Sequence, residues 1–107
     1  MRRLPPALAA SATPRILELL GDGPGRVLEV GFAGIHTRLL ELAGWEVEAL
    51  EPDPAHAILA QERGAHVVVQ AKGRYDAVVA PGDADLSGID TAKIVLADER
   101  GVASIAG

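Results

Sequence analysis

The stretch that decides the fold runs from Arg26 to Asp53 and reads RVLEVGFAGIHTRLLELAGWEVEALEPD. It opens with Val27 to Val30, a short and mostly apolar run that is typical of a central parallel strand. A glycine-bearing turn follows, and apolar residues then recur at helical spacing from Ile35 to Ala43. A second strand is predicted from Glu46 to Glu51, where it ends in an acid. Alternating strand and helix favours a parallel sheet covered by helices.

The flanking sequence continues the same alternation. Thr13-Pro14 and Asp53-Pro54 each read as an N-cap followed by proline, and they predict helices that end near Gly21 and Gly64. Further strands are predicted at His66–Gln70, Tyr75–Ala80, Lys93–Asp98 and Val102–Ile105, the last as a hairpin partner after a turn at 99–101. We therefore expect a Rossmann-like α/β fold: a mostly parallel sheet of five to six strands flanked by helices, with strand order close to 3-2-1-4-5. We also expect it to be abbreviated at its C-terminal end.

Length and composition predict one domain. The chain has 107 residues, and 49% of them are apolar, mostly small aliphatics, which is enough for a single core. We expect residues 1–12 to form a loosely ordered extension of this domain. They contain a short apolar stretch, but it is interrupted by Pro5 and Pro6 and is too short for a secretory signal.

Charge and residue usage exclude several function classes. The formal net charge is −5 and the basic residues form no stripe, so no nucleic-acid partner is expected. There is no cysteine, and the three histidines show no ligand spacing, so neither a disulfide nor a metal site is predicted. No apolar run is long enough to cross a membrane. These features together favour a cytoplasmic protein.

The turn after the first strand is the predicted site. Ligands of open α/β sheets lie at the carboxyl ends of the strands, where a glycine such as Gly31 lets the backbone approach closely. The following helix start presents free N–H groups. Glu51 ends the next strand twenty residues after Gly31, which is the place of a carboxylate that accepts hydrogen bonds from ribose hydroxyls.

These segments resemble class I S-adenosylmethionine-dependent methyltransferases. The first motif of that family is similar to Val27 to Gly34 followed by His36 to Leu40, its second strand to Trp45 to Pro54, and its fourth strand to Tyr75 to Ala80. The resemblance covers the chain from Ile16 to Pro81 and implies S-adenosylmethionine as the cofactor.

The resemblance also implies site residues. Glu29, Gly31 and Gly34 would hold the methionine part of the cofactor, and Glu51 would hold its ribose. The remaining positions of these motifs that would face the cofactor are Phe32, Ala33, Pro52 and, near the adenine, Gln70. Positions for an acceptor substrate would be His36, Pro81 and Asp83. No catalytic residue is identified.

The same turn leaves the function open. The family usually has Gly-x-Gly-x-Gly, whereas this chain has Gly31-Phe32-Ala33-Gly34-Ile35, one residue shorter. The dinucleotide pattern Gly-x-Gly-x-x-Gly is absent as well. Three hypotheses follow: an S-adenosylmethionine-binding protein of methyltransferase type, a non-catalytic relative that serves as a structural or partner-binding module, and a nucleotide-binding regulatory domain. Because the domain is small, we also expect it to complete its core by self-association or with a protein partner.

Overall fold

The computed structural model describes residues 12–98 and 101–106, so most of the expected N-terminal extension and part of the expected turn at 99–101 lie outside the described residues. The helices in this part are α2 (Thr13–Leu20), α3 (Thr37–Leu42) and α4 (Pro54–Glu62). The main sheet comprises β1 (Gly25–Val30), β2 (Trp45–Leu50), β3 (His66–Val68), β5 (Ala77–Ala80), β7 (Lys93–Asp98) and β8 (Gly101–Ala106). A separate parallel pair is formed by β4 (Arg74–Tyr75) and β6 (Asp90–Thr91).

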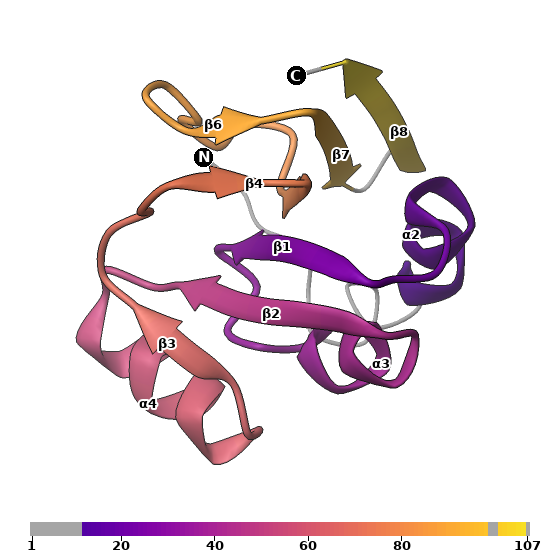
Figure 1. The fold of residues 1–107 in the computed structure, drawn as a ribbon. Coiled ribbons are helices and arrows are strands. Elements are labelled where there is room, and N and C mark those ends of the chain that lie inside the picture. The colour runs from indigo at the N-terminus through magenta and orange to yellow at the C-terminus, as the bar shows by residue number, and fades with distance from the viewer. Residues whose placement is uncertain (1–11, 99–100, 107) are drawn as a thin grey trace.

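The main sheet is mostly parallel. Its six strands lie in the order β3-β2-β1-β5-β7-β8, and only β8 runs antiparallel, as the partner of β7 (Figure 1). The predicted order of the first five strands and the predicted hairpin are confirmed. The chain therefore has a compact α/β fold in which the carboxyl ends of β1, β2 and β5 meet at one edge of the sheet.

The two faces of the sheet are covered differently. One face carries the larger core, in which Ile16 and Leu20 of α2 and Leu40 of α3 pack on Val27 and Val79. The other face is covered by β4, β6 and the loop between β5 and β6, which lie on the opposite side of the sheet from α3 and α4 in Figure 1. That second face thus has no helical cover among the described residues.

Two predicted strands are shorter than expected. The strand predicted at Tyr75–Ala80 is divided at Asp76, whose backbone N–H donates to the Arg26 carbonyl at 2.8 Å and whose carboxylate accepts from the Arg26 N–H at 2.8 Å. Regular pairing with β1 consequently begins only at Ala77. The third strand ends at Val68 rather than Gln70.

The two predicted helix caps differ in outcome. Asp53 caps α4 as expected, because its side chain accepts from the Ala55 N–H at 2.9 Å. Thr13 does not cap α2: Ala12 occupies the N-cap position, and the buried Thr13 hydroxyl lies 2.8 Å from Nδ1 of His36 instead. A residue that looked like a local helix signal therefore makes a long-range contact.

Candidate functional site

The turn between β1 and α3 is tightly wound. Gly31, Ala33 and Gly34 all have positive φ, at 73°, 51° and 77°. A glycine adopts this region without penalty, whereas Ala33 pays a steric cost there that its surroundings must offset. The turn (residues 31–36) lies at the carboxyl edge of the sheet, as predicted, and all of its residues are buried or half-buried.

Glu29 lies beneath this turn. Its side chain is fully buried, and its carboxylate accepts from the His36 backbone N–H at 2.9 Å and from the Thr37 hydroxyl at 2.6 Å. Burial raises the pKa of Glu29 to about 7, although the two hydrogen bonds counteract part of that rise. The acid predicted to hold a cofactor is thus occupied by the start of α3.

Glu51 holds the middle of the same turn. It is 1% exposed, and its Oε2 accepts from the Ala33 backbone N–H at 2.8 Å. Its other oxygen, Oε1, is buried and accepts no hydrogen bond from any residue that the structure describes. An unpartnered buried carboxylate oxygen is costly, and a ligand hydroxyl could satisfy Oε1 only if the turn opened.

His36 closes the turn over the core. Its ring has no exposed surface, lies edge-on to Phe32 with 4.7 Å between ring centroids, and contacts Thr13 through Nδ1. Burial lowers the pKa of His36 to about 4, so the ring is neutral near pH 7. Its Nε2 is buried and has no hydrogen-bond partner among residues 12–98 and 101–106. A substrate could reach this imidazole only if the turn opened.

Helix α4 fixes the outside of the turn. Arg63, the C-cap of α4, donates from Nη1 to the Ala33 carbonyl at 2.8 Å. A Cβ built on Gly34 would lie 3.1 Å from the Ala60 Cα, so any larger residue would require the turn or α4 to shift. The turn is therefore held from inside by Glu29 and Glu51 and from outside by α4.

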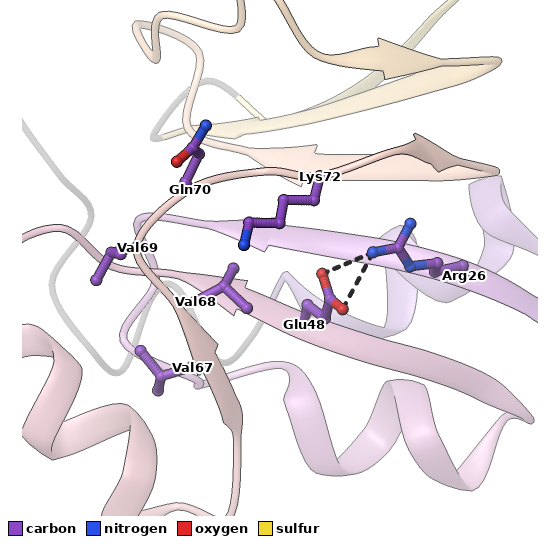
Figure 2. Close-up of a pocket in the computed structure, with 7 residues that line it drawn as sticks. All are labelled: Arg26, Glu48, Val67, Val68, Val69, Gln70 and Lys72. Atoms are coloured by element: carbon purple, nitrogen blue, oxygen red, sulfur yellow. Dashed lines mark hydrogen bonds and ion pairs between the residues drawn. The ribbon is translucent and has the colours of Figure 1, made fainter.

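The other predicted site residues lie around this edge in different environments. Pro52 is exposed directly after Glu51. Pro81 is buried at the end of β5, and Asp83 is exposed in the loop that follows. Gln70 is exposed and lines a cleft together with Arg26 and Glu48, with its amide directed away from that pair (Figure 2). The structure thus brings together the acids, the turn and His36, whereas Gln70 belongs to a different hollow.

Sequence reasoning missed one polar cluster, which consists of Arg26, Glu48 and Tyr75. Both Glu48 oxygens lie 3.1 Å from Nη2 of Arg26, and the Tyr75 hydroxyl donates to Glu48 Oε1 at 2.6 Å. The signal in the sequence was one charged residue within each of two strands, Arg26 in β1 and Glu48 in β2. That these two residues pair becomes visible only once the register of the strands is known.

Comparisons with known proteins identify no relative: no family model matches this chain, and no curated protein matches it either. Within residues 12–98 and 101–106, no group of acidic or histidine side chains is arranged to hold a metal ion. No helix of this part is long and apolar enough to span a membrane.

Proposed function

We propose that the chain is a non-catalytic, methyltransferase-like domain of Rossmann-like type that serves as a structural or partner-binding module. One observation carries the proposal: Glu29 and Glu51, the two acids that would hold a cofactor, are buried and accept hydrogen bonds from the turn itself. In this account the acids stabilise the turn, and the turn closes the edge of the sheet.

The energetic cost of opening the turn supports this reading. A cofactor bound at this edge would compete with the Ala33 and His36 N–H groups for the two carboxylates. A hydrogen bond to a charged group contributes roughly 1.5–3 kcal/mol. Exchanging two of them without replacement would weaken cofactor binding by roughly two to four orders of magnitude. Phe32, only 6% exposed, fills further space in the turn.

A second candidate, an S-adenosylmethionine-binding protein of methyltransferase type, is favoured by the unpartnered Oε1 of Glu51. This oxygen lies at the end of β2, where a ribose hydroxyl would donate to it. When bound, the cofactor would supply the methyl group, and the protein would mainly hold and orient the reactants. Glu51 would then bind the ribose, and the turn above Glu29 the methionine part. A nucleotide-binding regulatory domain would use the same acceptor.

Isothermal titration calorimetry with S-adenosylmethionine and S-adenosylhomocysteine separates these candidates. The proposal predicts no saturable heat with either ligand at millimolar concentration. Saturable binding that disappears in Glu51→Ala and Glu51→Gln would overturn it and establish the second candidate. Asp85→Ala is the matched control, because Asp85 is an exposed acid whose carboxylate accepts hydrogen bonds from nearby Ser87.

A further inference from the structure

A cleft lies on the sheet face that helices do not cover. It has a volume of about 400 Å³ and is lined by Arg26, Glu48, Val67, Val68, Val69, Gln70 and Lys72 (Figure 2). Ligand pockets of proteins usually measure roughly 300–1,000 Å³. Glu29 belongs to the opposite face of β1 from Arg26, because side chains alternate along a strand. The cleft is therefore separate from the turn site.

One wall of the cleft is polar and rigid. Arg26 binds both oxygens of Glu48 at 3.1 Å, and its guanidinium lies 4.2 Å from the centroid of the buried Tyr75 ring. The Tyr75 hydroxyl donates to Glu48 and accepts from the Lys72 backbone N–H at 3.2 Å. Because these groups satisfy one another, the Glu48 charge is already neutralised within the wall.

Lys72 supplies an unpaired charge. Its side chain extends into the cleft between Val68 and the Arg26–Glu48 pair, as Figure 2 shows. Among the residues that the structure describes, no carboxylate forms an ion pair with its ammonium. Two cations and one carboxylate line the cleft, which gives the lining a formal charge of +1 in a chain whose net charge is −5. The cleft thus attracts an anion.

The opposite side of the cleft is apolar. Val68 is half-buried and its side chain points toward Lys72, whereas the side chains of Val67 and Val69 point away from Lys72 (Figure 2). An aliphatic surface of this kind is stabilised when an apolar group covers it. A ligand that matches the whole cleft therefore combines an apolar body with one negative charge.

We propose that this cleft binds a small aliphatic carboxylate, with the carboxylate on the Lys72 ammonium and the hydrocarbon chain on Val68. A single negative charge matches the formal charge of the lining. The Arg26–Glu48–Tyr75 cluster forms the rigid polar wall that the ligand contacts. The proposal is independent of the function assigned to the turn, since Gln70 is the one residue predicted for the cofactor that lines this cleft.

The test is an NMR titration of the whole chain with hexanoate, with hexanol and hexylammonium as uncharged and cationic probes of the same chain length. We expect saturable shifts of the Val68, Val69 and Lys72 amides with hexanoate, and weaker or absent shifts with the other two probes. Equal binding of hexanol, or no saturation by hexanoate at tens of millimolar, would overturn the proposal.

Two variants locate the contacts. Lys72→Gln should weaken hexanoate binding by about fivefold, the size of one exposed ion pair, and Val68→Thr should weaken it through lost apolar contact. Lys72 is exposed and threonine keeps the shape of the half-buried Val68 side chain, so neither change should unfold the protein. Arg38→Gln, an equal change of charge on the exposed face of α3, should leave the affinity unchanged. Unchanged affinity in Lys72→Gln would refute the charge contact on which the proposal rests.

Discussion

Glu29 and His36 respond to burial in opposite directions although they are in contact. The backbone N–H of His36 donates to Glu29, and both side chains are fully buried. Burial disfavours the charged form of each, which raises the pKa of Glu29 from 4.5 to about 7 and lowers that of His36 from 6.5 to about 4. Their effects on stability therefore oppose each other between about pH 4.5 and 6.5.

Glu29→Gln should reveal these opposing effects. The raised pKa of Glu29 means that its contribution to stability is present below pH 4.5 and is lost as the pH rises to about 7. Replacing it by an amide of the same shape removes this loss. The free energy of unfolding of the variant, relative to that of the native protein, should therefore rise by up to about 3 kcal/mol between pH 4.5 and 7.5. Urea unfolding at a series of pH values measures the difference.

The depressed pKa of His36 acts in the other direction, since its contribution is present above pH 6.5 and is lost as the pH falls to about 4. Glu29→Gln should therefore lose stability steadily on acidification through this range, whereas the native protein should change little. A constant difference between the two proteins at all pH values would contradict the buried, titrating Glu29.

At the scale of elements, the contact between the turn and α4 makes the next prediction. Gly34→Ala adds a Cβ at positive φ and 3.1 Å from Ala60, whereas Gly64→Ala adds one at positive φ into open space. Both variants incur backbone strain of roughly 1–2 kcal/mol, and overpacking costs roughly 1–3 kcal/mol more at Gly34. Urea unfolding should thus find Gly34→Ala the less stable of the two by about 2 kcal/mol. Equal losses would show that α4 does not pack on the turn.

Tyr75→Phe tests the polar cluster on the other face. Burial by itself would raise the pKa of Glu48, but hydrogen bonds from Tyr75 and Arg26 outweigh it and hold that pKa below its ordinary value. Loss of the Tyr75 hydroxyl should destabilise the protein by about 2 kcal/mol and raise the Glu48 pKa, while the ring still packs under Arg26. Thermal unfolding and carbon-detected NMR titration measure the two effects. An unchanged Glu48 pKa would mean that the hydroxyl does not hold the carboxylate.

The sequence predicted those features that depend on neighbouring residues. Apolar runs and turn glycines marked the strands, and Asp53 marked the start of α4, whereas the strand order came from the expected Rossmann-like fold. The division of the fourth strand was not predictable, because Asp76 is held by Arg26, fifty residues away. The sequence also could not show that Glu29 and Glu51 accept hydrogen bonds from the turn. An acid at a strand end has the same local sequence whether a ligand or the backbone donates to it.

At the scale of the whole molecule, β8 is an edge strand of the main sheet, and no other strand of the described residues covers its free side. Gly101–Ala106 contains no charged residue and no proline, and Ile105 on it is 48% exposed. Edges of this kind pair readily with another strand, so we expect two copies to associate through β8. Sedimentation equilibrium should show a dimer that Ile105→Lys weakens and that Leu42→Lys, at a still more exposed apolar position on α3, leaves intact. A strict monomer at high concentration would contradict this expectation.

The central claim is that Glu29 and Glu51 bind the turn rather than a cofactor, and one NMR measurement tests it most directly. The Ala33 and His36 amides, which donate to these carboxylates, should be protected from hydrogen exchange, and their chemical shifts should stay constant when S-adenosylhomocysteine is added to millimolar concentration. Rapid exchange of both amides, or saturable shifts of both with the ligand, would contradict the account.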